Sequence, residues 1–498
     1  MSQIVTSAIN SREEAPSSVD ESLIQQALNQ YRHSFDARYG GFGNAPKFPA
    51  PHNLFFLMQQ YQKSKDKQLL EMAEKTLMQM YRGGLFDHIG GGFCRYSTDR
   101  YYLVPHFEKM LCDNALLIIA YCEAFRLTQK VIYRTIAEKT ADYILREMKS
   151  PQGGFYSAQD ADTDGEEGKY YTFYPREIKS IIGEADGEAF CGCYDITESG
   201  NFNGKSIPNL LRTVKPTDRF DAFLPSLREY RKNRTRLLTD DKILTFRNSL
   251  MIAALCTLYR VTGNDSYLHA AKAAQAFIED KLCADNTLYV SYRDEKHGVN
   301  GFLDDYAGYI YALIALYDTT LDNSYLNRAR QMTDKALAEF FDTAQGGLFM
   351  YGSNNEELIA RTKESYDGAV PCGNSLMTYN LVRLNHIAAQ EDMQAIIDKQ
   401  LRFMSGRAST YPSGFAAFLI ALSDYTRPPL MLTIVRGDDD LTELPFHIPS
   451  GTAVRVFNTP DKGYELLNNS SAFYICNDKS CLPPINKTDF YKKYKSFV

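Results

Sequence analysis

The run Ala115-Leu116-Leu117-Ile118-Ile119-Ala120-Tyr121 decides the fold class of this chain. It lies in the middle of His106–Gln129, a segment that predicts a helix with apolar residues on all sides. A helix without a polar face has to be surrounded by other parts of the protein. The rest of the chain must therefore supply elements that cover this helix.

Apolar and amphipathic helical segments alternate along the chain. Five more apolar segments are His52–Gln62, Asn248–Val261, Phe302–Thr320, Gly373–Ala388 and Pro412–Tyr425. Amphipathic segments, with one apolar stripe at helical spacing, are Val19–Ser34, Leu69–Met80, Tyr133–Met148, Leu268–Ile278, Leu326–Phe340 and Met393–Met404. Six of each kind predict a repeat of antiparallel helix pairs. We expect a mostly α fold, an (α/α)6 barrel or six-hairpin toroid over residues 19–427, because an open stack would leave its terminal repeats uncovered.

The connections differ in length according to direction. Turns from an apolar to an amphipathic helix are short, as at Gly263–Ser266. The return connections are long and rich in glycine: Asp36–Pro51, Gly83–Pro105, Lys149–Arg247, Cys283–Gly301 and Asp342–Cys372. All of them enter the inner helices at their N-terminal ends, so we expect one functional face there. The longest connection predicts a loop insertion at 150–246.

The two ends of the chain differ from the repeat. Residues 1–18 are polar, lack the apolar core of a secretory signal, and predict a disordered or linker segment. Three short β patterns, in Leu430–Val435, Ala453–Phe457 and Ala472–Ile475, predict a small α/β segment over residues 428–498.

Composition narrows the classes of function. The net charge is −6 and no basic stripe is present, which argues against a nucleic-acid partner. No uncharged apolar run reaches the length of a membrane span, so we expect no membrane partner. Aromatic residues are abundant, with 34 Tyr and 29 Phe but no Trp, which suits either a core or a cleft that stacks on rings.

The ten cysteines fit a reducing compartment. Cys112, Cys122 and Cys256 lie in apolar helical stretches and predict buried free thiols. Cys476 and Cys481 form a C-x4-C pair without a second pair of metal ligands, and we interpret them as unconnected thiols. We expect a cytoplasmic location.

The glycine-rich loops carry the residues that could perform chemistry. We expect the fold to bring their carboxylates and two histidines together on one functional face. There these groups could cleave a glycosidic bond by acid/base catalysis, or move a proton beside a carbonyl in sugar epimerisation. The candidate catalytic residues are His106, Glu108, Asp160, Asp162, Asp241 and Asp305. The candidate substrate-binding residues are Lys47, His88, Arg95, Tyr96, Lys242, Asn248, Tyr306 and Asn374.

Structural interpretations remain open for several of these residues. Asp241 and Asp305 stand where an aspartate caps a helix. His106 and Glu108 could form a buried pair. The run from Asp160 to Glu167 resembles a calcium loop, but Tyr171 stands where that loop has its bidentate glutamate, so we predict no metal and no other cofactor.

The chain resembles the thioredoxin-domain-containing family of the YyaL and spermatogenesis-associated protein 20 type. The resemblance covers nearly the whole chain and is most specific at His106-Phe107-Glu108-Lys109-Met110. Other matching strings are Gly40–Pro49, Gly83–Asp99, Val104–Asn114, Gly153–Gly168, Asp240–Asn248, Leu303–Ala307 and Asp367–Asn374. It implies a larger domain like six-hairpin glycosidases and N-acylglucosamine 2-epimerases, acting on an unidentified substrate.

Several features depart from the family pattern. The N-terminal thioredoxin-like domain is missing, so the chain is expected to be a fragment, a truncation or a split form. Tyr102, Phe173 and Arg247 stand at positions where the family has Trp, and Leu237 stands where it has Pro. Arg247 is the largest change, because it places a cation where the resemblance implies a stacking ring.

Three interpretations of function follow. The first is a sugar-active domain, either a hydrolase or an epimerase, with His106 as the proton carrier and a small-molecule sugar as its ligand. The second is a non-catalytic domain that binds ligands or clients for a thioredoxin-like partner. The third is a degenerate remnant, suggested by the missing domain and the lost Trp residues.

Overall fold

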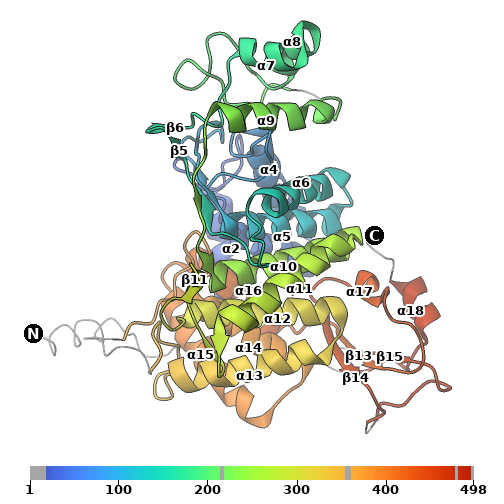
Figure 1. Ribbon diagram of the computed structural model, residues 1–498. Coiled ribbons are helices and arrows are strands. Elements are labelled where there is room, and N and C mark those ends of the chain that lie inside the picture. Colours follow the sequence, from blue (N-terminus) through green and yellow to red (C-terminus); the bar gives the residue numbers. More distant parts are fainter. Residues whose placement is uncertain (1–17, 214–217, 354–360, 462, 477–479, 495–498) are drawn as a thin grey trace, which may run out of the picture. The chain divides into compact units, whose positions relative to one another are not determined.

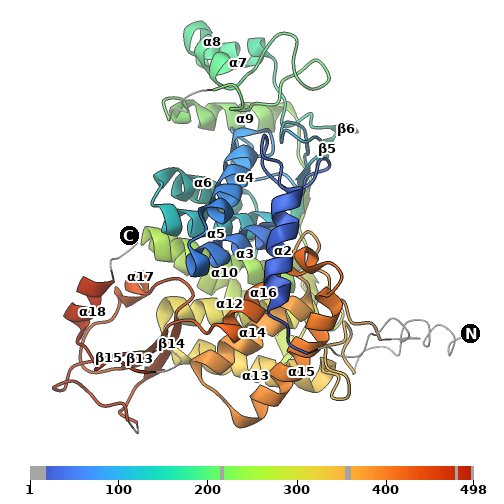
Figure 2. The same ribbon diagram turned by 180° about the vertical axis from the view of Figure 1, so that it is seen from behind.

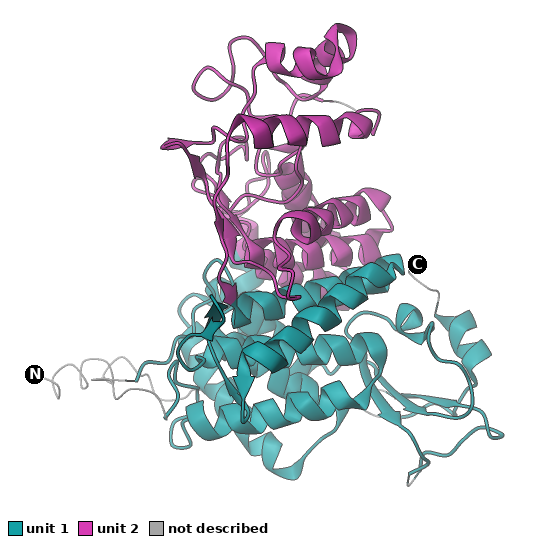
Figure 3. Cartoon of the chain, viewed as in Figure 1, with its two compact units in different colours: residues 1–30, 244–498 teal, residues 31–243 magenta. Residues whose placement is uncertain are grey.

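The computed structural model describes residues 18–213, 218–353, 361–461, 463–476 and 480–494 (Figure 1). Apart from Ser18, the expected linker at 1–18 lies outside the described residues. The chain divides into two compact units, which we call unit 1 (residues 1–30 and 244–498) and unit 2 (residues 31–243; Figure 3). Among the described helices, none has both the length and the apolar content that a bilayer crossing requires.

The alternation of apolar and amphipathic segments corresponds to pairs of packed helices. In unit 2 the pairs are α3 (Pro51–Ser64) with α4 (Lys67–Arg82), and α5 (Leu111–Thr128) with α6 (Val131–Glu147). In unit 1 they are α10 (Thr245–Thr262) with α11 (Asp265–Lys281), α12 (Leu303–Thr320) with α13 (Asn323–Phe340), and α14 (Gly373–Ile387) with α15 (Glu391–Ala408).

The sixth pair joins the beginning of the helical region to its end. Helix α2 (Ser22–Ser34) lies beside α16 (Ala416–Thr426), which follows a 3-10 turn at Pro412–Phe415 (Figure 2). The backbone N–H of Ser413 donates to Oε1 of Gln30 at 2.9 Å. Glu21 pairs with Arg427 at 2.5 Å. These two contacts join the first amphipathic helix to the segments that flank the last apolar one.

The apolar helices contact one another in chain order within each unit. Helix α3 contacts α5 in unit 2, and α10, α12, α14 and α16 form a continuous series in unit 1. In α5, Leu117, Ile118 and Ala120 have no exposed surface. This burial explains why these helices carry no polar face.

Helix α5 begins later than the sequence predicted. We expected the helix to begin at His106, but it starts at Leu111. Strand β2 (Pro105–His106) pairs with β1 (Tyr96–Ser97), and β3 (Lys109–Met110) joins β4 (Ala158–Gln159) and β7 (Thr239–Asp240) in a sheet of order β3-β4-β7. The expectation is wrong because strand pairing takes up the backbone polar groups just before the helix.

The predicted loop insertion at 150–246 contains regular structure. It includes α7 (Pro175–Ile182), α8 (Glu184–Cys193), α9 (Leu224–Arg234) and a 3-10 turn at Asp221–Phe223. Strands β5 (Asp162–Thr163) and β6 (Glu166–Glu167) form a hairpin over the acidic run. Further short strands are β8 (Ile243–Leu244), β9 (Cys283–Ala284), β10 (Thr287–Leu288), β11 (Ser291–Arg293) and β12 (Lys296–His297).

The C-terminal segment forms the predicted α/β structure. Strand β13 (Met431–Val435) runs parallel to β14 (Ala453–Phe457) and antiparallel to β15 (Ala472–Cys476), in the order β14-β13-β15. Two short helices accompany the sheet, α17 (Leu444–His447) and α18 (Lys487–Lys493). Tyr317 of α12 donates to the carbonyl of Val454 at 3.2 Å, so the segment packs on α12 within unit 1.

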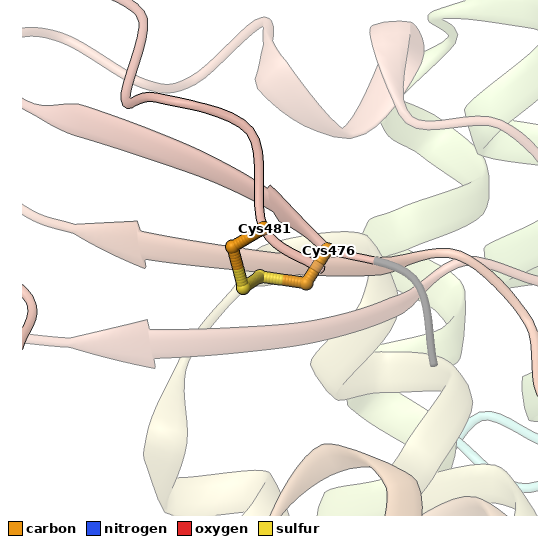
Figure 4. Close-up of a disulfide and its surroundings, with 2 residues drawn as sticks. All are labelled: Cys476 and Cys481. Carbon is orange, nitrogen blue, oxygen red and sulfur yellow. A yellow bond between two sulfur atoms is a disulfide. The ribbon is translucent and has the colours of Figure 1, made fainter. Parts of the chain in front are cut away.

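The C-x4-C pair is joined by a disulfide. Cys476 at the end of β15 is bonded to Cys481 on the segment that returns beside this strand (Figure 4). Our interpretation of two unconnected thiols is therefore wrong. The pairing of the returning segment with β15 brings the two residues face to face, which the spacing of the cysteines alone does not reveal. The other eight cysteines are free thiols, among them the buried Cys112, Cys122 and Cys256.

Three connecting loops share one pattern, F-D-x-x-x-G-G followed by Phe or Leu, at residues 35–42, 86–93 and 341–348. We call them the aspartate loops. In each loop, the N–H of the aspartate donates to the carbonyl of the second glycine, and the N–H of the first glycine donates back to the carbonyl of the aspartate. All six glycines have φ between 68° and 80°, a region that other residues rarely adopt.

A buried lysine anchors each aspartate loop. The Nζ to Oδ2 distances are 2.9 Å for Lys47 and Asp36, 2.8 Å for Lys109 and Asp87, and 2.7 Å for Lys363 and Asp342. Each lysine side chain is only 1% exposed, and its Nζ also donates to the carbonyl of the loop's first glycine. Each of the three aspartate loops is therefore stabilised by the same kind of buried ion pair.

Candidate functional site

Four acidic residues of unit 1 lie near the N-terminal ends of α12 and α14, and we call them the carboxyl cluster. They are Asp304, Asp305, Glu364 and Asp367. Among the described residues, no ion pair joins any of the four to a cation. Burial without a cationic partner favours the protonated form of a carboxyl group, and it raises the pKa of Asp304, Asp305 and Asp367.

Asp305 is a buried group with both oxygens in use. Its Oδ1 accepts a hydrogen bond from the N–H of Phe246 at 3.1 Å, and its Oδ2 accepts one from the N–H of Phe302 at 2.9 Å. Burial raises the pKa of Asp305 to about 7, although these two donors act in the opposite direction. Asp305 thus ties the start of α10 to the start of α12.

Asp304 is the more accessible of the two neighbouring aspartates. Its side chain is half-buried, and a Cβ placed on Gly373 would lie 2.5 Å from its Oδ1. Burial and the negative charge of Glu364 raise the pKa of Asp304 to about 6, against a hydrogen bond from the N–H of Gly373. A carboxyl group with this pKa is about half protonated at pH 6 and about one-tenth protonated at pH 7, far more than an aspartate at its ordinary pKa.

Asp367 supports the entry to α14. Its Oδ1 accepts from the N–H of Cys372 at 3.0 Å, and its Oδ2 accepts from the N–H of Ala417 at 2.9 Å. Burial raises its pKa to about 6 against these hydrogen bonds. Like Asp305, it links the starts of two apolar helices, here α14 and α16.

Two exposed tyrosines stand next to Asp367. Tyr366 and Tyr411 are 52% and 53% exposed. A Cβ on Gly414 would lie 2.4 Å from the ring of Tyr366 and 2.9 Å from that of Tyr411, so both rings flank this glycine. Exposed aromatic faces beside carboxyl groups suit the binding of a sugar ring.

A second group of polar residues lies in unit 2, and we call it the imidazole cluster. His106 Nδ1 is 2.7 Å from Oε1 of Glu167, and its Nε2 is 3.7 Å from Oε2 of Glu108. Arg95 contacts the same Oε2 of Glu108 at 2.8 Å. When Nδ1 donates to Glu167, Nε2 of the neutral ring is free to accept a proton.

Aromatic rings extend the imidazole cluster. Tyr96 lies opposite His106 in the β1–β2 pair, with ring centroids 5.3 Å apart. Phe48 stacks on Tyr96 at 4.6 Å and is 44% exposed. The structure thus brings together His106, Glu108, Arg95 and Tyr96, four of the residues that the sequence singled out.

Other predicted residues have structural contacts. His88 is buried among aromatic rings, its Nε2 lies 3.1 Å from the carbonyl of Gly83, and burial lowers its pKa to about 4. Lys47 belongs to an aspartate loop. Asn248 donates to the carbonyl of Leu244, and the Tyr306 hydroxyl accepts from the N–H of Leu288. The Asn374 side chain accepts a hydrogen bond from the N–H of Leu348 and donates one to its carbonyl. The Asn114 side chain makes the same two hydrogen bonds with Phe93.

The remaining acidic candidates lie on adjoining loops of unit 2. The N–H of Asp160 donates to the carbonyl of Leu238, which places the acidic hairpin beside the segment that carries Asp241 and Lys242. Asp162, Asp241 and Lys242 are exposed. In the described part of the chain, no group of three or more His, Cys, Asp or Glu side chains could hold a metal ion.

Sequence reasoning missed three acidic residues and two rings. Asp304, Asp367, Glu364, Tyr366 and Tyr411 were not among the candidates. The sequence did contain a signal for Asp304. It lies in the first turn of an apolar helix, where a carboxylate does not contribute to the apolar core. Glu167 was also missed, because its contact with His106 spans 61 residues of sequence.

Comparisons with known proteins define the relationships of the chain. Residues 240–371 match the model of glycosyl hydrolase family 76. Spermatogenesis-associated protein 20 of Homo sapiens is 28% identical over 562 residues, covering 97% of this chain and 71% of that protein. The chain is a homologue of spermatogenesis-associated protein 20. The Mus musculus protein is 30% identical over 450 residues, covering 78% of this chain and 57% of that protein, so the chain spans only part of its curated relatives.

Solved structures establish the fold class. A D-mannose isomerase is 14% identical with a TM-score of 0.52, covering 82% of this chain and 96% of that chain. An α-mannanase of glycoside hydrolase family 76 from Bacteroides thetaiotaomicron is 11% identical with a TM-score of 0.51, covering 82% and 95%. A Salegentibacter α-1,6-mannanase is 12% identical with a TM-score of 0.51, covering 81% and 98%. It is an inactive variant, with two consecutive aspartates replaced by alanine, in complex with α-1,6-mannotetrose. The chain has the predicted (α/α)6 fold, which it shares with these three structures.

Proposed function

We propose that this chain is a carbohydrate-active enzyme that cleaves a glycosidic bond at the carboxyl cluster, with Asp304 as the general acid. The observation that carries the proposal is the environment of Asp304. Its half-buried carboxyl group has a pKa raised to about 6 by burial and by the charge of Glu364. Glycosidases need one carboxyl group that stays protonated near neutral pH and a second that is ionised.

The two carboxyl groups have the environments that this division of roles requires. Asp304 would donate its proton to the oxygen of the leaving sugar. Glu364 is exposed to solvent and would act as the second carboxyl group, either as a base toward water or as a nucleophile. Asp305 would act as a positioning residue, because its hydrogen bonds to Phe246 and Phe302 fix the first turn of α12.

The comparisons support the choice of this site and suggest a first substrate. The segment that matches family 76 contains two pairs of consecutive aspartates, Asp240-Asp241 and Asp304-Asp305. Asp304-Asp305 opens an apolar helix and has raised pKa values at both positions. The Salegentibacter variant lost two consecutive aspartates and binds a mannose oligomer. We therefore select α-1,6-linked mannose oligosaccharides as the first substrates to test.

The test compares three variants with the wild-type chain. Release of reducing ends from α-1,6-mannotetrose would be followed for wild type, Asp304→Asn, Glu364→Gln and Asp294→Asn. Asp294 carries a carboxylate that is 85% exposed in the same unit and serves as the matched control. We expect Asp304→Asn to lower kcat by about 10²- to 10⁴-fold while Asp294→Asn leaves it unchanged. Binding without turnover in wild type would favour the non-catalytic alternative, in which the domain presents ligands to a thioredoxin-like partner.

A second candidate is sugar isomerisation or epimerisation at the imidazole cluster. The specific observation is the 2.7 Å contact between His106 and Glu167, which leaves Nε2 available as a base. The two candidates differ in product, because isomerisation changes a free sugar without breaking a glycosidic bond. His106→Gln should abolish turnover of mannose or N-acyl hexosamines in this case, and Asp304→Asn should not.

A further inference from the structure

The disulfide Cys476–Cys481 lies beside a cavity in the C-terminal α/β segment. The cavity has a volume of about 250 Å³ and is lined by both cysteines, His386, Pro428, Pro429, Met431, Thr433, Arg455 and Tyr464. All of these residues belong to unit 1. A volume of this size is close to the lower end of small-molecule sites.

One polar group in the cavity wall has no partner. Thr433 on β13 is completely buried, and its Oγ1 forms no hydrogen bond. A buried hydroxyl in this state is unfavourable unless another molecule supplies the hydrogen bond. Thr433 therefore adds an unsatisfied polar group to the wall of the cavity.

The charged and titratable residues of the cavity favour an anion. Arg455 lies opposite Thr433 in the parallel pair of β14 and β13, and its Nε donates to the carbonyl of Ile387 at 2.6 Å. This contact holds the guanidinium group at the cavity. His386 is also part of the lining, and the lining includes no Asp or Glu. A guanidinium group suits a carboxylate.

The two cysteines differ in exposure. Cys476 is only 7% exposed, whereas Cys481 lies exposed at the surface. A thiolate from solvent can therefore reach Cys481 more readily than Cys476. The rate of disulfide exchange depends on which sulfur is attacked and on access to it.

We propose that Cys476–Cys481 is a reactive disulfide, and that the cavity binds small thiols that carry a carboxylate. The carboxylate pairs with Arg455, and a polar group of the ligand bonds to Thr433. The ligand thiolate attacks Sγ of Cys481. A bond forms between the ligand sulfur and Cys481, the bond between Cys481 and Cys476 breaks, and Cys476 leaves as a thiolate. A second thiolate then attacks the ligand sulfur, which releases Cys481 and a disulfide of the ligand, so two thiols are oxidised and one protein disulfide is reduced.

The test measures disulfide exchange and involves no sugar turnover, so its outcome is independent of the proposed function. The oxidised full-length chain would react with reduced glutathione or with 2-mercaptoethanol, a neutral thiol. Acid quenching, alkylation and peptide mass mapping would locate the mixed disulfide and give its rate of formation. Rates would be divided by the thiolate fraction of each reagent, because the thiolate is the nucleophile.

We expect glutathione to react about five- to tenfold faster per thiolate than the neutral thiol, with the mixed disulfide on Cys481. Arg455→Gln should remove this preference, and Thr433→Val should reduce it. Arg436→Gln, which changes an exposed arginine at the end of β13, should keep it. Equal rates for the two thiols, a mixed disulfide on Cys476, resistance to both thiols under native conditions, or two free thiols in the oxidised chain would each overturn the proposal.

Discussion

The Nζ of Lys109 lies 2.8 Å from Oδ2 of Asp87, and the two side chains are 1% and 7% exposed. Arg231 contacts the same Oδ2 at 2.8 Å. Burial acts to raise the pKa of Asp87, but Arg231 and Lys109 outweigh it and hold that pKa well below its usual value. Lys109 belongs to the string His106–Met110, so the most specific motif of the sequence contains a structural anchor beside the imidazole cluster.

Breaking this pair should destabilise the fold. Lys109→Met leaves Asp87 buried with only Arg231, and we expect the free energy of unfolding to fall by about 3 kcal/mol, the lower end for a broken buried pair. The measurement is urea denaturation followed by circular dichroism. Lys130→Met removes a lysine that is 57% exposed and pairs with Glu74, and it should cost less than about 1 kcal/mol. Equal losses for the two variants would contradict the anchoring role.

The second glycine of an aspartate loop should not tolerate a side chain. Gly92 has φ of +77°, and a Cβ there would lie 2.3 Å from the ring of Tyr143. Gly43 has φ of +73° but open space around it. Both alanine variants carry the same backbone strain of about 1–2 kcal/mol, so the additional loss in Gly92→Ala isolates the clash. Thermal unfolding should show a clearly lower Tm for Gly92→Ala, and similar Tm values would refute the close packing.

The raised pKa of Asp367 should make stability depend on pH. Its pKa moves from 3.8 to about 6, so between these values the native state binds more protons than the unfolded state. The stabilisation is therefore complete below pH 4 and is lost as pH rises through 6. The difference in unfolding free energy between wild type and Asp367→Asn should fall by roughly 3 kcal/mol between pH 4 and pH 8. A difference that stays constant over this range would show that Asp367 does not titrate as described.

Asp304 and Asp305 should respond differently to the same substitution. Asn at 305 would place an amide N–H₂ against one of two backbone N–H donors, so Asp305→Asn should lower stability by about 1–3 kcal/mol. The raised pKa of Asp304 makes its charged form unfavourable in the native state, so Asp304→Asn should not lower stability near neutral pH and should act on turnover. Denaturation curves of the two variants test this difference. If Asp304→Asn is the less stable of the two, the assignment of roles is reversed.

Sequence patterns predicted the helical framework well. The apolar run around Ile118 and the apolar, partly β-branched run Leu430–Val435 are local signals, and α5 and β13 form at these positions. The start of α5 was not predictable in this way, because it depends on the pairing of Lys109–Met110 with Ala158–Gln159, about 50 residues away. The helices within 150–246 were missed because α7 and α8 are short and lie in a glycine-rich context.

The candidate sites were predicted in part. His106, Glu108, Arg95 and Tyr96 are close in sequence and in space, so the motif was sufficient to group them. Residues of the same type can differ in burial and hydrogen bonding, and the sequence alone does not reveal this difference. Asp304 and Asp305 are neighbours of the same type, yet only the structure shows that Asp305 has both oxygens bonded to backbone N–H groups. His88 and His106 likewise differ only in their surroundings.

The pH dependence of turnover tests the role of Asp304 as general acid most directly. Hydrolysis of α-1,6-mannotetrose would be measured from pH 4 to pH 9 for wild type, Asp304→Asn and Asp294→Asn. We expect kcat/KM of wild type and Asp294→Asn to decline above an apparent pKa of about 6, and Asp304→Asn to lose the reaction. Turnover by Asp304→Asn at the wild-type rate, or no turnover and no binding of mannose oligosaccharides by wild type, would contradict it.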